Sequence, residues 1–272
     1  MRLSSLATLV IAIAGVTACG SDKVTDPGTP PLAGVRFING LSDSSAVDVK
    51  MIDQVNWSFN GVQAIAFRSG TEHQPIEAKA RQIRVFPNSN VPAITSAFMV
   101  DTSITFNANS RYTLLLTRET PTHVHLIVIN DDVAAPAAGQ IAIRLVNAST
   151  GAIDAYVVDT TTTPIAGAPT AANLAAYATS GYAARGAARA AVRVTAAGSA
   201  TVSASQAGPP STNTPTPAGE NPLASVYNAG TAFSVFYFPR SVAGTSAPQS
   251  TAPVNFTVPG IVWFVDRNPA QQ

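Results

Sequence analysis

An internal repeat is the feature that most constrains how this chain can fold. Segments 35–53 and 143–159 contain the same kinds of residue in the same order. Each has an Arg, two apolar residues, an Asn, a Ser-rich turn and then an Asp that directly follows an aliphatic residue. Two further pairs of segments follow in the same order, at offsets that grow from 108 to 121 residues: 82–85 with 191–194, and 106–116 with 227–237. We therefore predict two tandem modules of one fold, over residues 34–132 and 139–272.

Each module has the pattern of short strands separated by turn residues. Alternation is clearest at 36–38, 47–49, 83–85 and 112–114. Segments 126–129 and 261–265 are continuous apolar runs, typical of strands buried in the middle of a sandwich. About seven strands in roughly 110 residues predict an all-β chain of two tandem immunoglobulin-like antiparallel β-sandwich modules.

Residues 181–194 carry Arg185, Arg189 and Arg193 among alanines, a pattern that also suits a helix. The matching stretch of the first module, 78–85, ends in a strand pattern, so we interpret this segment as a strand with Arg189, Ala191 and Arg193 on one face. Because the second module has six Arg and four carboxylates, Arg185, Arg189 and Arg193 are candidate binding residues for an anionic polysaccharide or lipid headgroup.

The N-terminus predicts export and a lipid anchor. A short basic start and the apolar run 6–16 have the size of a signal-peptide core, which is too short to span a bilayer. Small residues lead to Cys19, the only cysteine of the chain, as in a bacterial lipobox. We predict a signal peptide over 1–18 and acylation of Cys19 with palmitate; the alternative is ordinary secretory cleavage that leaves a free thiol.

Residues 19–33 contain three prolines and little to bury, which indicates a flexible tether from the lipidated Cys19. Gly20 and Ser21 follow the cysteine where an Asp would favour retention in the inner membrane. We therefore expect a cell-envelope protein anchored in the outer membrane, facing the periplasm or the cell surface. Residues 207–222 form a second Pro- and Thr-rich segment, predicted to be a loop within module 2.

Composition excludes several classes of function. Charged residues are 11% of the chain, with 16 basic and 15 acidic side chains, so no bulk charge attracts nucleic acid. The chain has no nucleophile elbow, zinc-protease helix, phosphate-binding loop or dinucleotide fingerprint. We predict no enzymatic activity, no cofactor and no nucleic-acid partner.

His123 and His125 are the only candidates for a metal site. Two histidines at i and i+2 of a strand project from one face, and Asp131 and Asp132 follow nearby. An exposed pair beside a turn explains the same pattern, so we predict no metal and keep both residues as candidates. His73 lies in the region where the second module carries Tyr182, and it is expected to be an exposed or half-buried ring.

Two charged pairs recur in the repeat, Arg36 with Asp48 and Arg144 with Asp154. The simpler interpretation is that each pair bridges neighbouring strands or holds a turn, and the alternative is that they bind a ligand. Asn39 and Asn147 are expected to cap turns through their amides. Trp57, Trp263, Tyr237 and Phe238 are interpreted as core or interface residues rather than as platforms for sugars.

At the repeated segments the chain resembles the family known as domain of unknown function 4397. The match lies in 47–49 and 153–155, which follow its Val-Asp-Val motif, and in 109–113 and 230–234, which approximate its Gly-x-x-Tyr-Thr signature. Asn39 and Asn147 replace a usual His. The resemblance implies a β-sandwich in an envelope setting and supplies no activity.

These observations favour a lipid-anchored, non-enzymatic envelope protein with a structural, adhesion or spacer role. Its expected partners are the membrane, through Cys19, and an envelope polysaccharide or another envelope protein. The alternative is a carbohydrate- or metal-binding envelope receptor on the same anchor.

Overall fold

The computed structural model describes residues 28, 30–44, 46–53, 61–120, 123–161, 165, 167–210, 223–242 and 255–269. The predicted signal peptide, Cys19, most of the tether, Trp57 and most of the predicted 207–222 loop lie outside the described residues.

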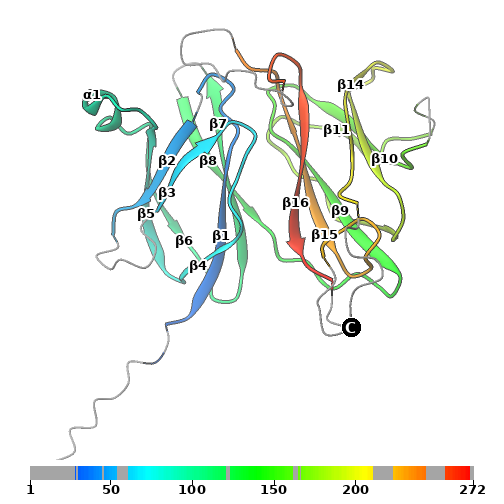
Figure 1. Ribbon diagram of the computed structural model, residues 1–272, viewed down its shortest axis with the longest axis horizontal. Helices are drawn as coiled ribbons and strands as arrows, with labels where there is room; N and C mark the ends of the chain where they lie inside the picture. The colour runs from blue at the N-terminus through cyan, green and yellow to red at the C-terminus, as the bar shows by residue number, and fades with distance from the viewer. Residues whose placement is uncertain are drawn as a thin grey trace, which may run out of the picture. The chain divides into compact units, whose positions relative to one another are not determined.

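The first sandwich consists of eight strands and one short helix (Figure 1). They are β1 (Leu32–Asn39), β2 (Ala46–Met51), β3 (Gly61–Ala66), β4 (Gln74–Glu77), β5 (Ala80–Pro87), α1 (Pro92–Thr95), β6 (Val100–Thr105), β7 (Arg111–Thr120) and β8 (His123–Asn130).

The second sandwich repeats the eight strands in the same order. They are β9 (Gln140–Asn147), β10 (Ile153–Val158), β11 (Ala171–Leu174), β12 (Ala183–Gly186), β13 (Ala191–Ala196), β14 (Val202–Ala207), β15 (Ala232–Phe238) and β16 (Gly260–Arg267). The predicted junction at 133–138 falls between β8 and β9.

Both sandwiches have one topology. In the first, the sheets run β4-β1-β7-β8 and β3-β2-β5-β6; in the second, β12-β9-β15-β16 and β11-β10-β13-β14. We call the sheets that contain β1 and β9 the inner sheets and the other two the outer sheets. In each inner sheet the first strand pairs in parallel with the seventh, whereas the other pairings are antiparallel. The predicted all-β duplicated sandwich is confirmed, with eight strands rather than about seven in each copy.

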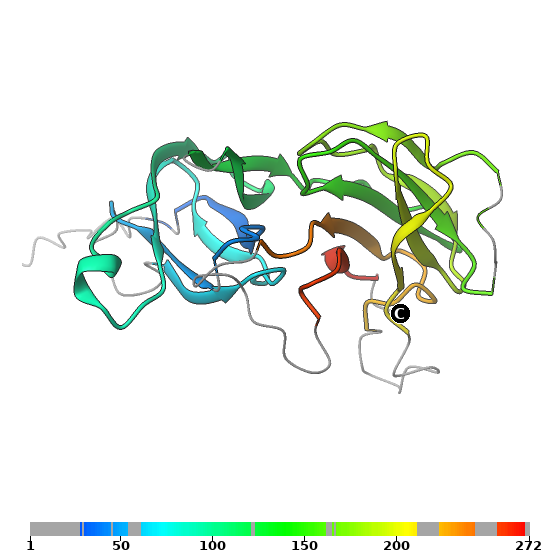
Figure 2. The ribbon, with the colours of Figure 1, turned by 90° about the horizontal axis from the view of Figure 1, so that it is seen from above.

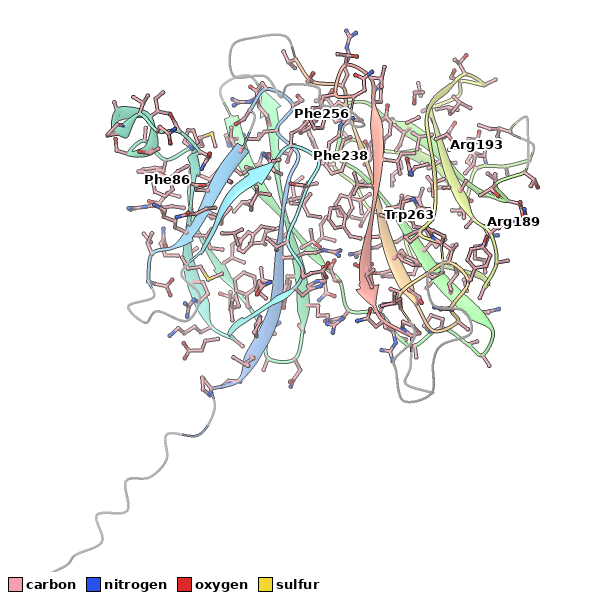
Figure 3. The ribbon with its side chains drawn as sticks, viewed as in Figure 1. Phe86, Arg189, Arg193, Phe238, Phe256 and Trp263 are labelled. Atoms are coloured by element: carbon pink, nitrogen blue, oxygen red, sulfur yellow. The ribbon has the colours of Figure 1, made fainter. Side chains whose placement is uncertain are left out.

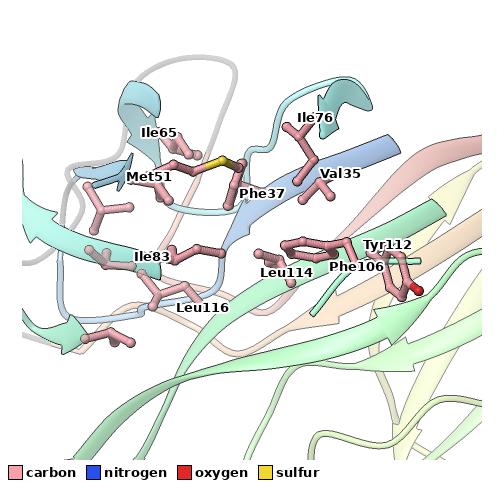
Figure 4. Close-up of a cluster of buried hydrophobic side chains, with 14 of the residues drawn as sticks. Val35, Phe37, Met51, Ile65, Ile76, Ile83, Phe106, Tyr112, Leu114 and Leu116 are labelled. Atoms are coloured by element: carbon pink, nitrogen blue, oxygen red, sulfur yellow. The ribbon is translucent and has the colours of Figure 1, made fainter. Parts of the chain in front are cut away.

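Three hydrophobic clusters join the four sheets. One fills the first sandwich, where Val35, Phe37, Ile83 and Leu114 meet (Figure 4), and a second fills the other sandwich in the same way. The third lies between the inner sheets and includes Ile38, Leu115, Val146 and Phe236. Figure 2 shows the two groups of strands from above. Residues 31–272 form one compact unit that contains both sandwiches.

The third cluster explains why the central strands of the inner sheets are apolar or buried on both faces. On β1, Val35 and Phe37 face the first core, while Arg36 and Ile38 face the second sandwich. A strand with only one covered face would alternate between apolar and exposed residues. β9 is instead buried over all but its first residue.

The prediction that 126–129 and 261–265 are central strands is wrong. They belong to β8 and β16, which lie at the edges of their sheets and are half-buried. Their apolar runs are continuous because both faces are covered. Trp263 and Val265 pack on the second core, whereas Val262 and Phe264 pack on the cluster between the inner sheets.

Segment 181–194 contains a strand but not the single face that we predicted. β13 begins at Ala191, so the choice of strand over helix is confirmed for residues 191–196. Arg189 precedes this strand, and Arg185 lies on β12 in a different sheet. Among the described residues, no helix is long and apolar enough to cross a bilayer.

Candidate functional site

A cluster of buried charges lies between the two inner sheets. Arg36, Arg144, Asp131 and Asp266 are each at most 4% exposed. Each sandwich contributes one Arg from its first strand and one Asp from the end of its eighth strand. We call these four residues, with the side chains that bond to them, the interface network.

Arg36 reaches from the first sandwich into the second. Its Nη2 donates to Asp266 Oδ1 at 2.5 Å, and its Nη1 donates to the Val265 carbonyl at 3.1 Å. Its Nε donates to Thr113 Oγ1 on the neighbouring strand β7 at 2.6 Å. Because β1 pairs in parallel with β7, Arg36 and Thr113 stand opposite each other in register.

Arg144 makes the same three contacts in the opposite direction. Its Nη2 bonds to Asp131 Oδ1, its Nη1 donates to the Asn130 carbonyl at 2.6 Å, and its Nε donates to Ser234 Oγ at 2.6 Å. Arg144 and Ser234 stand opposite each other on β9 and β15. The interface network therefore has a pseudo-two-fold arrangement, like the isologous interface of a symmetric dimer.

The second oxygen of each Asp is also occupied by an equivalent set of partners. Asp131 Oδ2 accepts from Thr113 Oγ1 at 2.5 Å and lies 2.8 Å from His73 Nε2. Asp266 Oδ2 accepts from Ser234 Oγ at 2.6 Å and from Tyr182 Oη at 2.8 Å. His73, expected to be exposed or half-buried, is half-buried, and so is Tyr182; each of them bonds to one of the two carboxylates.

The network shifts the acidity of its members. Desolvation opposes the ionisation of Asp131, but the His73 hydrogen bond, the Arg36 and Arg144 charges and the Thr113 hydroxyl together lower its pKa below the usual value. Burial, with the adjacent Asp266 charge, raises the pKa of Tyr182. Asp131 is therefore a carboxylate and Tyr182 a neutral donor at neutral pH.

This arrangement is suited to joining the sandwiches in one geometry. Two Arg and two Asp cancel in charge, and their buried polar atoms all have hydrogen-bond partners within the described chain. A buried ion pair contributes little net stability, but removing one partner leaves a buried charge unpaired. Such a network therefore disfavours any other docking of the two inner sheets.

The predicted pairs Arg36–Asp48 and Arg144–Asp154 do not form. Arg36 and Arg144 lie on inner sheets, whereas β2 and β10, which carry the two Asp residues, belong to outer sheets. We expected these pairs because the two residues of each pair are close in sequence, but the sandwich places them in separate layers.

Asp48 and Asp154 instead hold a bulge in each outer sheet. The strand register shifts at both residues. Asp48 Oδ1 accepts from the Ala64 amide at 2.8 Å, and Asp154 Oδ1 accepts from the Asn173 amide at 2.6 Å. Ala64 and Asn173 have φ of 54° and 48°, so the carboxylate stabilises a backbone conformation that side chains disfavour. The Asp of the Val-Asp-Val motif therefore has a structural role.

The two turn asparagines behave as predicted. Asn39 Oδ1 accepts from the Leu41 amide at 2.9 Å, and Asn147 Oδ1 accepts from the Ser149 amide at 3.0 Å. Asn39 Nδ2 also donates to the Ile65 carbonyl of β3, and Asn147 Nδ2 donates to the carbonyls of Leu174 and Ala175 at the end of β11. Both residues are fully buried, and their turns follow the first strand of each sandwich.

Two further residues extend across the interface from equivalent turns. Arg68 and Tyr177 have φ of 60° each and follow the third strand of their sandwiches. Arg68 Nη2 donates to the carbonyls of Pro239 and Val258 at 2.6 and 2.5 Å. Tyr177 Oη donates to the Arg118 carbonyl at 2.7 Å in the opposite direction.

Arg68 is held by carbonyls and rings. Its guanidinium lies 4.9 Å from the centre of the Phe67 ring and 5.4 Å from that of Phe256, which packs near Phe238 (Figure 3). Desolvation lowers the pKa of Arg68 to about 10, so it stays charged at neutral pH. Gly260 gives it room, because a Cβ there would lie 2.5 Å from Arg68 Nη1.

A crevice of about 570 Å³ opens beside the interface network, where β8 and β16 end. Its walls come from both sandwiches and are largely polar. The lining residues are Asn109, Arg111, Asp131, Asp132, Val133, Asp266, Arg267 and Asn268. Sequence reasoning named Asp131 and Asp132 only as neighbours of the histidine pair, and it missed the crevice because Asn268 and Asn109 lie 159 residues apart.

His123 and His125 lie on one face of β8, as predicted for i and i+2. Their ring centres are 5.3 Å apart, and the His125 ring also contacts Tyr177 edge-on. Asp131 is engaged by the interface network instead. Among the described residues, no group of three or more His, Cys, Asp or Glu side chains could hold a metal ion.

Arg185, Arg189 and Arg193 are engaged in different ways. Arg185 donates to the carbonyls of Val158 and Arg189, at 3.4 and 2.9 Å, and lines a second hollow of about 450 Å³ with Asp159. Arg193 is buried in β13. Arg189 and Arg193 are labelled on the second sandwich in Figure 3.

The described residues thus define an all-β protein of two duplicated sandwiches joined by a buried ionic network. Residues 33–156 match the family described as Domain of unknown function (DUF4397), so the predicted resemblance is confirmed over that region. The matched region covers the first sandwich and continues through β9 into β10.

No curated protein matches the chain. The solved structures that match include CBMbc, a family CBM26 module from Eubacterium rectale Amy13K, in complex with maltoheptaose. The two chains are 9% identical, and the match covers 79% of this chain and 99% of that one with a TM-score of 0.25.

Proposed function

We propose that this chain is a lipid-anchored, non-enzymatic protein of the bacterial envelope whose two joined sandwiches act as one rigid structural or adhesion body. The observation that carries the proposal is the interface network. Its ionisable groups, which could otherwise serve a reaction, are bonded to one another across the two sandwiches. A body that must transmit or resist force benefits from modules held in one orientation.

The anchor part of the proposal rests on the sequence. Cys19 follows an apolar run of signal-peptide size, and a Pro-rich tether separates it from β1. Several acyl chains on one residue hold a protein on a bilayer far more firmly than one chain. Gly20 and Ser21 follow the cysteine where an Asp would favour retention in the inner membrane, so we propose that the protein is anchored in the outer membrane.

The Cys19→Ser variant tests the anchor. Cells that express the whole chain are grown with radiolabelled palmitate, and their membranes are fractionated. We expect label on the parent chain in the outer-membrane fraction, and loss of both the label and membrane retention in Cys19→Ser. Ser21→Ala, two residues away, is the matched control and should keep both. Unchanged labelling of Cys19→Ser would refute the anchor.

The second candidate function is a carbohydrate receptor on the same anchor. The polar crevice at the ends of β8 and β16 favours it over a metal receptor, because the crevice brings together guanidinium, amide and carboxylate groups that can bond to hydroxyls. The two functions are compatible, since a rigid envelope protein can bind a polysaccharide through one site.

A further inference from the structure

We propose that the crevice at the ends of β8 and β16 binds an acidic sugar residue of a polysaccharide, through the sugar's carboxylate. This inference deepens the proposed envelope role, on which it rests, by naming the chemical class of the ligand. The crevice takes its residues from both sandwiches, so the site exists only where the sandwiches are docked as described.

The charge of the crevice favours an anion. Arg111 and Arg267 form no ion pair with any carboxylate in the described part of the chain, and Arg111 uses only Nη1, on the Asp266 carbonyl. The carboxylates of Asp131 and Asp266 are neutralised by Arg36 and Arg144. Arg111 and Arg267 then line the crevice together with one further carboxylate, that of Asp132. Guanidinium is the group that matches carboxylate oxygens in a bidentate fashion.

That further carboxylate is already hydrogen-bonded on both oxygens. Asp132 Oδ1 accepts from the Arg111 amide at 2.8 Å, and Oδ2 accepts from the Asn130 side-chain amide at 3.0 Å. It is exposed, so its remaining lone pairs face water in the crevice. These lone pairs can accept from sugar hydroxyls, while the amides of Asn109 and Asn268 can both donate and accept.

The residues that supply this chemistry are those in which the two copies differ. Asn109 and Arg111 correspond to Gly230 and Ala232 in the second copy, and Asp132 corresponds to Arg267. Asn109 and Gly230 share a left-handed backbone, with φ of 62° and 87°, so the turn is satisfied by either residue. The interface network, in contrast, keeps its charged residues in both copies. The fold therefore requires Asp131 and Asp266 of the lining but not the side chains of Asn109, Arg111, Asp132 and Arg267.

The experiment measures sugar binding to the whole chain, purified in detergent, by isothermal titration calorimetry. The probes are a galacturonic acid oligosaccharide, a neutral galactose oligosaccharide of the same length, and sodium sulfate. We expect saturable binding of the acidic oligosaccharide alone, weakened as salt is raised from about 50 to 500 mM, because salt screens a partly exposed ion pair.

Arg267→Gln should weaken that binding by about tenfold or more, because it removes a charge-assisted hydrogen bond but keeps a polar side chain. Arg84→Gln, on β5 of the outer sheet and outside the crevice, is the matched control and should bind like the parent. Circular dichroism and a thermal melt verify that both variants are folded.

Three results would overturn the inference: no binding of the acidic oligosaccharide, equal binding of the neutral oligosaccharide or sulfate, or undiminished binding by a folded Arg267→Gln. None of these three results bears on the proposed lipid anchor, because palmitate labelling at Cys19 is measured separately. A labelled chain that ignores the acidic oligosaccharide would refute only the crevice, and an unlabelled chain that binds it would refute only the anchor.

Discussion

The two sandwiches agree in what holds them together and differ in what they present to solvent. They share the strand order and the parallel pairing of the first and seventh strands. They also share the Asp that holds the bulge of the outer sheet, and the Arg, the hydroxyl residue and the Asp of the interface network. They differ in the link between the fifth and sixth strands, which contains α1 in the first sandwich and is a short turn at 197–201 in the second. Within one chain, the second copy therefore shows which features of the first the fold needs.

The same comparison separates two kinds of polar residue. The network residues Arg36 and Arg144 have equivalent partners, so their role belongs to the shared fold. Arg111 is exposed where the second copy has Ala232, and its guanidinium uses only Nη1, on the Asp266 carbonyl, so the fold accounts for only one of its side-chain donors. The second copy thus shows which polar residues the shared fold keeps, as a comparison with a related chain would.

Asp131→Ala and Asp266→Ala should give the largest loss of stability. Each substitution removes the carboxylate that bonds to an Arg of the other sandwich. The buried guanidinium then keeps only a longer contact with the remaining Asp, at 3.5 Å for Arg36 and 4.0 Å for Arg144. Loss of one partner of a buried ion pair typically costs about 3–5 kcal/mol. Because the network is pseudo-symmetric, we expect the two variants to lose similar free energies of unfolding in urea titrations.

The matched control is Asp132→Ala, next in sequence but exposed, which should lose far less. A loss below about 1 kcal/mol for Asp131→Ala would mean that the network is not a closed set of contacts. A large difference between Asp131→Ala and Asp266→Ala would break the equivalence of the two copies.

Arg68→Met and Tyr177→Phe should have intermediate effects that rank in that order. Arg68 donates to three carbonyls of the second sandwich and lies over two rings, and hydrogen bonds to a charged group contribute about 2 kcal/mol. Tyr177 gives one neutral hydrogen bond, worth about 1 kcal/mol. Thermal melts compare the two, with Arg118→Met as a control, because only the backbone carbonyl of Arg118 accepts from Tyr177. If Tyr177→Phe lowered the melting temperature more than Arg68→Met, the two turns would not make equivalent contributions to the interface.

The fold was largely predictable because the repeat carries strong signals. The Arg, Asn and Asp landmarks lie in equivalent strands and turns, and the segments 36–38, 47–49, 83–85 and 112–114 all fall within strands. Asn39 and Asn147 cap their turns through their side chains, as expected of Asn after a strand. These features depend on local sequence, which a repeat presents twice.

The candidate site was not predictable in the same way, because its partners are distant in sequence. Arg36 was expected to pair with Asp48, twelve residues on, but it bonds to Asp266, 230 residues away. The apolar runs in β8 and β16 were correctly interpreted as strands, but their place at the edges of the sheets was not predicted. One face of each run is covered by the other sandwich, and a single sequence does not show which face meets a neighbour. The signal available was an Asp at the equivalent position near the end of each last strand. Only Asp131 was noted, as a neighbour of the histidine pair, and Asp266 was not.

Ile94→Ser should have the smallest effect, and it tests the link in which the two copies differ most. Val91, Ile94 and Phe98 are 45–51% exposed, and α1 buries no residue. The short turn of the second copy shows that such a sandwich forms without this segment, so we expect a change in unfolding free energy within about 0.5 kcal/mol. Ile83→Ser, buried in the first core, is the opposite control and should unfold far more easily. A loss above about 1 kcal/mol in Ile94→Ser would show that the α1 link stabilises the first sandwich, and the second copy would then not report on what the first one needs.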